Sequence, residues 1–221
     1  AALDVGAELE ESPLPKANAK DFASLLELSC SIGPSSPLAE LSRLGQVEQV
    51  EALKLTMRAA DSEWLDDFYN AEGLRVIVER LGEIECLVNK EDDDLRLQSE
   101  LLKCLKAGMN HEAAIDKIKT NPALVPALAL NLSSEDVYIA TQVLELLAVL
   151  MVDGPEGHQM IVDAFSYFKL AKGERVRFFS LVDALWSEQV DLAFKRDVLL
   201  FLNTLINSSA DMEERILLRS D

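Results

Sequence analysis

Three leucine-led segments decide the fold: Leu105–Asn110 (LKAGMN), Leu147–Val152 (LAVLMV) and Leu202–Asn207 (LNTLIN). Apolar or small residues recur in them at matching positions, 42 and then 55 residues apart, and a fainter copy begins at Leu55. Spacings of about 40 to 47 residues with two or three helices in each unit are typical of armadillo and HEAT arrays. The repeat therefore predicts a stack of helical units. A compact, non-repeating helical bundle would have the same composition but would not explain the shared register.

Hydrophobic periodicity predicts helices along almost the whole chain from Asp21 onward. A first short helix ends at the Gly-Pro-Ser-Ser-Pro run 33–37, and a second is expected at 38–44. No alternating apolar and polar run bounded by hairpin turns is present, so strands are not expected. The remaining predicted helices are 46–59, 62–69, 72–89, 94–109, 111–119, 122–131, 135–152, 156–171, 174–187, 190–207 and 210–219. Side chains expected to cap helix starts are Asp61, Asn121, Ser133 and Ser208.

The predicted fold class is all-α: an armadillo-repeat-like, right-handed superhelical solenoid with a small N-terminal helical subdomain. Residues 1–19 lack sustained periodicity and are expected to form a flexible tail. Residues 20–60 would form the N-terminal helical part, and residues 61–221 the armadillo repeats, the last of which could be truncated. The helix expected at 135–152 is apolar nearly all round, which indicates that it lies between layers.

Charge and composition exclude several classes of function. With 39 acidic and 21 basic residues the chain has a formal net charge of -18, which should repel nucleic acids and anionic membranes. The longest dense apolar segment, 143–152, is half the ~20 residues that a membrane helix needs, so no membrane span is expected. Three cysteines without a Cys-x-x-Cys pair indicate a reducing compartment, either cytosolic or nuclear. Residues 61–100 carry 13 acids and 4 bases, which suits either a solubilising face or a docking surface for a basic peptide.

Motifs for catalysis are missing from the sequence. The two histidines have no neighbours at zinc-ligand spacing, and neither a phosphate-binding glycine loop nor a Gly-x-Ser-x-Gly elbow occurs. The chain is therefore predicted not to be an enzyme and to need no cofactor or metal. Cys104, Trp64 and Trp186 stand in apolar helix faces, where we expect them to be core residues.

Four stretches, in their order and spacing, resemble the regulatory armadillo region of diaphanous-related formins. They are Glu51–Met57, Trp64–Leu74, Leu102–Asn110 and Leu144–His158, and the stretches Phe201–Asn207 and Arg215–Ser220 continue the series. The resemblance extends from about residue 20 to the end of the chain. It implies a GTPase-binding and formin homology 3 region that contains the diaphanous inhibitory domain. In that family a concave groove holds a C-terminal autoregulatory segment, an amphipathic helix with leucines followed by basic residues, and this contact silences actin assembly.

The resemblance also implies the binding residues. GTP-loaded Rho-family proteins bind the N-terminal helices and the first repeat of such formins and release the autoregulatory segment, so residues 20–60 become the GTPase-binding part. The matching GTPase contacts are Leu55, Ala59 and Ala60, and the matching groove residues are Lys106, Asn110, Ile115, Val149, Val152 and Asn203. Actin would be reached only through the rest of the protein, and the location would be cytoplasmic and cytoskeletal.

Several of these residues have a second interpretation. Ile115 and Val152 could equally be solenoid core, and Ala59 and Ala60 could simply end a helix, since several family members have asparagine at those two positions. Val149 stands where alanine is common, and Leu200 replaces a polar residue, so the groove is expected to be narrower and more apolar than usual. The alternative function is an armadillo or HEAT adaptor outside the formins that binds another basic helical peptide.

Overall fold

The computed structural model describes residues 18–26, 45–209 and 211–220, and every regular element in these ranges is a helix. None of these helices is long and apolar enough to cross a membrane. In chain order they are α1 (Ala19–Leu26), α2 (Gln46–Ala59), α3 (Ser62–Asn70), α4 (Gly73–Glu85), α5 (Asp92–Gly108), α6 (Glu112–Thr120), α7 (Leu124–Ala129), the 3-10 helix η3 (Leu130–Ser133), α8 (Val137–Met151), α9 (Gly154–Lys172), α10 (Phe179–Trp186), α11 (Leu192–Ser208) and α12 (Met212–Ser220).

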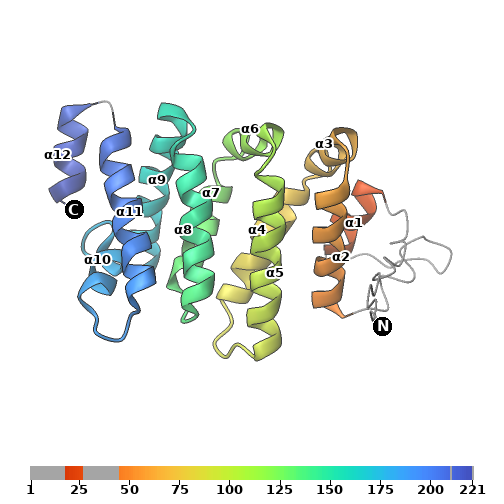
Figure 1. Ribbon diagram of the computed structural model, residues 1–221, viewed down its shortest axis with the longest axis horizontal. Coiled ribbons are helices and arrows are strands. Elements are labelled where there is room, and N and C mark those ends of the chain that lie inside the picture. The colour runs from red at the N-terminus through yellow and green to blue at the C-terminus, as the bar shows by residue number, and fades with distance from the viewer. Residues whose placement is uncertain (1–17, 27–44, 210, 221) are drawn as a thin grey trace, which may run out of the picture.

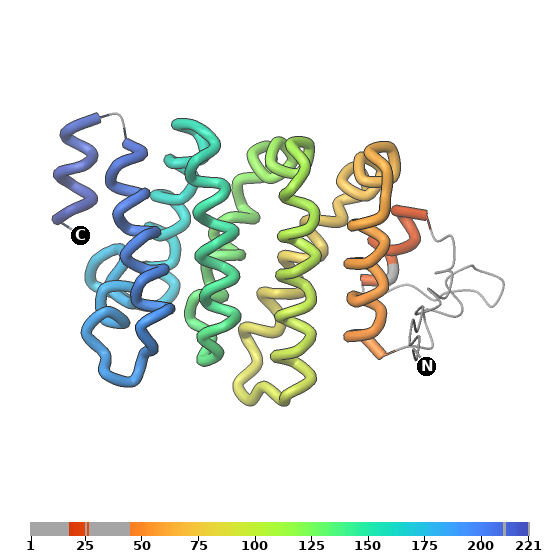
Figure 2. Tube along the Cα trace, in the orientation of Figure 1, coloured from red at the N-terminus to blue at the C-terminus, as the bar shows by residue number. Residues whose placement is uncertain are grey.

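The helices form an all-α, armadillo-like array of three-helix units. The units are α3–α5, α6–α8 and α9–α11, with α1 and α2 before them and α12 after them. Figure 1 shows α2, α5, α8 and α11 side by side in one layer, with α4, α7, α9 and α10 behind it. The tube in Figure 2 follows the same path from one end of the array to the other, so each unit contacts mainly the units next to it.

The leucine-led segments fall in the last turns of the third helices, as predicted. Leu105 and Leu147 are fully buried in α5 and α8, and Leu202 is half-buried in α11. The fainter copy is wrong in register, because Leu55 is 51% exposed and its neighbours Leu53 and Met57 are buried instead. The third helices nevertheless recur at the predicted places.

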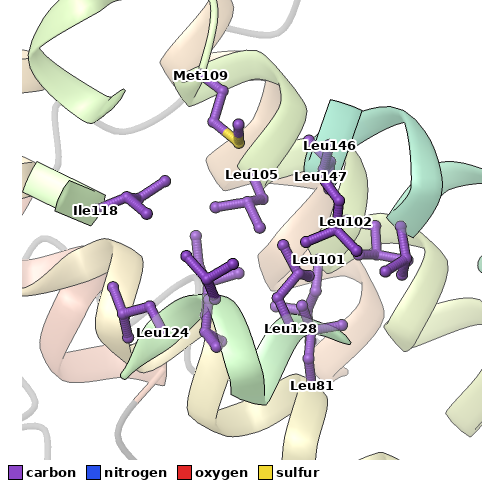
Figure 3. Packing of buried hydrophobic residues seen from close by; sticks show 14 of the residues in the cluster. Leu81, Leu101, Leu102, Leu105, Met109, Ile118, Leu124, Leu128, Leu146 and Leu147 are labelled. Atoms are coloured by element: carbon purple, nitrogen blue, oxygen red, sulfur yellow. The ribbon is translucent and has the colours of Figure 1, made fainter. Parts of the chain in front are cut away.

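The core is continuous along the array. One cluster of buried apolar residues runs from α1 to α12. Figure 3 shows where the first two units meet: Leu101 and Leu105 of α5 lie among Leu81 of α4, Leu128 of α7 and Leu147 of α8. All five are at most 2% exposed. Neighbouring units therefore supply each other's cover, as the apolar helix at 135–152 required.

The N-terminal helices pack onto the first unit. Helix α1 packs on α3 and α4, and α2 on α5. Phe22 of α1 meets Trp64 of α3 edge-on with ring centroids 6.0 Å apart, and Trp64 stacks on Phe68 at 5.6 Å. Ala19, at the end of the predicted tail, is buried and begins α1. The other residues of that tail up to 17, and the helix expected at 38–44, lie outside the described ranges.

Cap predictions were right at one of four positions. Asp61 accepts a hydrogen bond from the Trp64 N–H at 2.9 Å, as expected. Ser133 is part of η3, whereas Asp136 caps α8 by accepting from the Tyr138 N–H at 2.8 Å. Asn121 follows the end of α6 and Ser208 is the last residue of α11, so neither begins a helix. A carboxylate closer to the helix start outcompetes a more distant hydroxyl.

Two predicted helices are shorter than their apolar patterns. Helix α4 ends at Glu85, and Val88 beyond it is 95% exposed because no neighbouring helix covers it. Helix α10 begins only at Phe179, because Gly173 (φ +68°) closes α9 and Phe178 (φ 63°) is also left-handed. Trp186 at the end of α10 is 80% exposed, so its assignment as a core residue was wrong.

Candidate protein-binding surface

The predicted groove residues lie mainly on the layer of third helices. Lys106 and Asn110 belong to α5 and its C-terminal turn, Val149 and Val152 to the same part of α8, and Asn203 to α11. All five are exposed, and α8 packs between α5 and α11 (Figure 1). We call the surface formed by these five residues the third-helix face.

Helical spacing explains why α8 exposes these residues although it is almost entirely apolar. Tyr138, Glu145, Val149 and Val152 recur at intervals of three, four and seven, which places them on one side of the helix. Val149 is 42% exposed and Val152 63% exposed. The interpretation of Val152 as core is therefore wrong, and two valines face solvent without apolar cover.

An ion pair and a cation–ring contact join α5 to α8. The Lys106 Nζ lies 2.5 Å from Glu145 Oε2, and the Lys103 Nζ lies 5.8 Å from the ring centre of Tyr138. Glu145 and Tyr138 were not among the predicted residues. Their spacing from Val149 on one helix face was the signal that could have found them. On the third-helix face, α5 contributes the polar residues Lys106 and Asn110, and α8 contributes the apolar residues Val149 and Val152.

The apolar character continues onto α11. Leu199 and Leu200 are 56% and 63% exposed near Asn203, whose Oδ1 accepts a hydrogen bond from Asn207 Nδ2 at 3.0 Å. Ile115 differs from the other predicted groove residues. It lies on α6, half-buried and packed against the core, so the structure favours its structural role.

The predicted GTPase contacts lie at the end of the array where α2 begins the layer. Leu55 and Ala59 are exposed on α2. Ala60 is the residue after the helix, half-buried and packed against the core. The structure therefore leaves two of the three side chains accessible to a partner.

A buried ionic network joins α2 to α5. Glu100 is 6% exposed, and its carboxylate pairs with Lys54 of α2 and with Lys103 at 2.8 Å. Burial alone would raise the pKa of Glu100, but the hydrogen bonds from Lys103 and Lys54 outweigh it and lower that pKa. The carboxylate is therefore charged at neutral pH and holds α2 against the first unit.

The acidic surplus of residues 61–100 lies elsewhere. Glu72, Glu79 and Glu83 are exposed along α4, which is behind α5 in Figure 1. The run Glu91–Asp94 forms a capping box at the start of α5, with Glu91 N–H donating to Asp94 Oδ2 at 2.9 Å. Part of the acidic run thus stabilises a helix end. The acidic residues along α4 therefore lie apart from the third-helix face.

Groups for covalent or metal chemistry do not gather on this surface. Within the described residues no set of three or more His, Cys, Asp and Glu side chains could hold a metal. Burial raises the pKa of the Cys104 thiol to about 12, which keeps it protonated and in the core as predicted. The arrangement suits recognition of another polypeptide.

The fold and this surface define a helical-repeat binding module, and comparisons with known proteins identify its family. The Diaphanous GTPase-binding Domain matches residues 15–152, and the Diaphanous FH3 Domain matches residues 158–221. The chain therefore belongs to the diaphanous-related formins, and an adaptor outside the formins is excluded. The GTPase-binding match includes the first two units as well as α1 and α2.

Individual relatives agree with this family. The chain is 28% identical to inverted formin-2 of Xenopus laevis over 181 residues, 82% of this chain and 16% of that protein. It is 34% identical to human formin-like protein 2 over 131 residues, 59% of this chain and 12% of that protein. It therefore spans less than a fifth of these relatives.

A solved structure shares the fold. The crystal structure of E. histolytica Formin1 bound to EhRho1-GTPgammaS matches with a TM-score of 0.69 at 16% identity, over 92% of this chain and 64% of that one. An engineered protein matches with a TM-score of 0.56 at 19% identity, over 89% of this chain and 67% of that one. These likenesses support the armadillo-like architecture.

Proposed function

We propose that this chain is the non-enzymatic regulatory region of its formin. The third-helix face would bind the C-terminal autoregulatory segment of the same formin and so silence actin assembly, and a Rho-family GTPase bound at the N-terminal helices would release it. The observation that carries the proposal is the pair of uncovered valines, Val149 and Val152, on the exposed side of α8. Actin would be affected only through the rest of the protein, in the cytoplasm at the cytoskeleton, without a cofactor or metal.

The physics of the face suits an amphipathic helix. Covering an exposed valine side chain stabilises a complex by about 1 kcal/mol, given ~25 cal/mol per Å² of apolar surface. Leu199 and Leu200 extend this apolar surface onto α11. The amide of Asn203 and the ammonium of Lys106 are placed to bond polar groups of a bound helix. The apolar residues would supply affinity and the polar ones orientation.

Release would follow from linkage between two sites. A GTPase that binds α2 through Leu55 and Ala59, and that binds better when the third-helix face is empty, shifts the population toward the segment-free form. The network of Glu100 with Lys54 and Lys103 joins α2 to α5, so the two sites share a connected layer. The solved complex of Formin1 with EhRho1-GTPgammaS supports a Rho-type partner.

Calorimetry with the C-terminal segment encoded by the same gene tests the groove. Val149→Asp puts a charge in the centre of the third-helix face and should weaken binding about 100-fold or more. Val137→Asp is the matched control, because Val137 is on the same helix and 37% exposed but lies at its other end. Circular dichroism should show equal helix content in both variants. Unchanged affinity of Val149→Asp would contradict binding of the C-terminal segment at the third-helix face.

Pull-down with Rho-family GTPases tests the second site. Binding should require the GTPγS-loaded form, should fall with Leu55→Asp, and should displace the bound C-terminal segment. Binding that ignores the nucleotide state, or that leaves the segment bound, would contradict release by a GTPase while leaving the groove result standing.

A further inference from the structure

A basic motif before Ser180 has no role in the binding surface described above. Arg175 and Arg177 stand five and three positions before Ser180, and Leu181 follows it. No other serine or threonine in the sequence has arginine at both positions. Basophilic serine/threonine kinases select this pattern, because carboxylates in their substrate clefts pair with the two guanidinium groups. We propose that Ser180 is a phosphorylation site for such a kinase, with ATP as the phosphoryl donor.

The hydroxyl of Ser180 is accessible. Ser180 is exposed in the first turn of α10, and among the described residues its side chain makes no hydrogen bond. The hydroxyl of Ser166, in the middle of α9, instead donates to the Val162 carbonyl at 2.9 Å. Arg175 is also exposed, in the non-helical stretch between α9 and α10. The nucleophile and one of its recognition residues are therefore both at the surface.

Kinases bind their substrates extended, so the segment around Ser180 must open locally before it is phosphorylated. Helix α10 has eight residues, and only Leu181 among them is buried. A helix this short has little stability of its own. The side chain of Phe178, the residue before α10, is buried. Its backbone is left-handed with φ 63°, which is strained for phenylalanine, and opening of the segment would relieve that strain. Opening also exposes two core side chains, Leu181 and Phe178, whose ring lies 4.7 Å from that of Phe165.

Ser99 shows what the fold adds to the motif. Arg96 stands three positions before Ser99, so its sequence meets half of the pattern. Ser99 lies in the middle of the 17-residue helix α5, between the buried residues Gln98 and Glu100. Extending that segment would break the core of the first unit. Accessibility therefore selects Ser180 over Ser99.

The reaction is an ordinary phosphoryl transfer. Ser180 Oγ bonds to the γ-phosphorus of ATP as the bond to the β,γ-bridging oxygen breaks, ADP leaves, and the hydroxyl proton passes to the kinase's base. The product adds about −1.5 to −2 charges at neutral pH. This charge would lie at the second residue of α10, where the helix dipole favours an anion, with Arg175 and Arg177 just upstream. Phosphorylation should therefore stabilise α10.

Labelling of the 221-residue chain with a basophilic kinase and γ-labelled ATP tests the site, with mass spectrometry to locate the phosphate. We expect label on Ser180, loss of it in Ser180→Ala, and a decrease of about tenfold or more in Arg175→Ala, an exposed position that should not disturb folding. Ser99→Ala and Ser166→Ala should label like the parent chain.

Several results would overturn the proposal. Label that persists in Ser180→Ala, or that is found on Ser99, would place the site elsewhere. A free peptide of residues 173–183 that is phosphorylated while the folded chain is not would show that α10 does not open. After phosphorylation, amide exchange in α10 should slow about two- to fivefold. Unchanged or faster amide exchange would show that phosphorylation of Ser180 does not stabilise α10.

Discussion

Helices α4 and α10 hold the same place in the first and third units, but they are buried very differently. Each follows a left-handed residue, Glu72 (φ 62°) or Phe178 (φ 63°). Helix α4 packs on α1, α5 and α7 and buries seven residues, whereas α10 buries only Leu181. Helix α10 is not less apolar than α4, because it contains Phe179, Val182 and Trp186. These three side chains are nevertheless exposed. In a repeat array, a helix is buried by its neighbours and not by its own sequence.

Replacing the two tryptophans should give the largest difference in stability between the first and the third unit. Trp64→Ala should lower the free energy of unfolding by about 3 kcal/mol, because it removes the stacking on Phe68 and the edge contact with Phe22. Trp186→Ala should change it by less than about 0.5 kcal/mol, since that ring is 80% exposed. Urea titration followed by circular dichroism measures both. Similar losses in the two variants would mean that α10 is covered as well as α3.

A pair of valines sharpens the comparison at matched positions. Val76 and Val182 are both the fourth residue of their helices, with exposures of 3% and 39%. Val76→Ala should cost about 2 kcal/mol, from lost burial and the cavity it leaves, and Val182→Ala under about 0.5 kcal/mol. The same denaturation experiment applies. If the valine of α10 costs as much as that of α4, the contrast between the two ends fails.

The ionic network of α2 and α5 should give the smallest effect, and it depends on pH. The lowered pKa of Glu100 means that its stabilising charge is fully present above its ordinary pKa of 4.5 and is lost as the pH falls through the lowered value. Glu100→Gln should cost about 1 kcal/mol at pH 7, and the difference from the parent chain should shrink on acidification. Melting curves between pH 7 and acid conditions measure this.

Glu145→Gln is the matched control for that network. Glu145 also pairs with a lysine, but it and Lys106 are both at least half exposed, with side-chain exposures of 50% and 55%. Exposed pairs contribute little, so its variant should follow the parent curve within about 0.5 kcal/mol. An equal loss at both glutamates would show that burial of the pair is unimportant.

Much of the fold could be predicted from the sequence. The helix 46–59 was predicted with the bounds that α2 has, and the registers at Leu105 and Leu147 mark buried third helices. These predictions succeeded because burial on one side of a helix leaves a period in the sequence. Of the predicted groove residues, five share one exposed layer of the structure. Their binding roles are still predictions.

The failures have a common physical origin. Trp186 was placed in a core because its neighbours in sequence are apolar, but its ring is 80% exposed. Ser133 was assigned as a cap on residue type alone, although Asp136 stands closer to the first turn. The type of a side chain indicates which contacts it can make. It does not indicate whether another helix, or the start of a helix, lies close enough to make them.

By itself the sequence determined that the chain is helical, that its helices repeat, and that its charge disfavours nucleic acids, because these depend on residue type and spacing. Only the tertiary structure decided which apolar residues remain exposed on the third helices and that the acidic residues of α4 lie apart from them. It also decided that Ser180 is exposed on a short helix while Ser99 lies half-buried in a long, packed one. These properties depend on which helix covers which, and that is set by contacts between residues far apart in the chain.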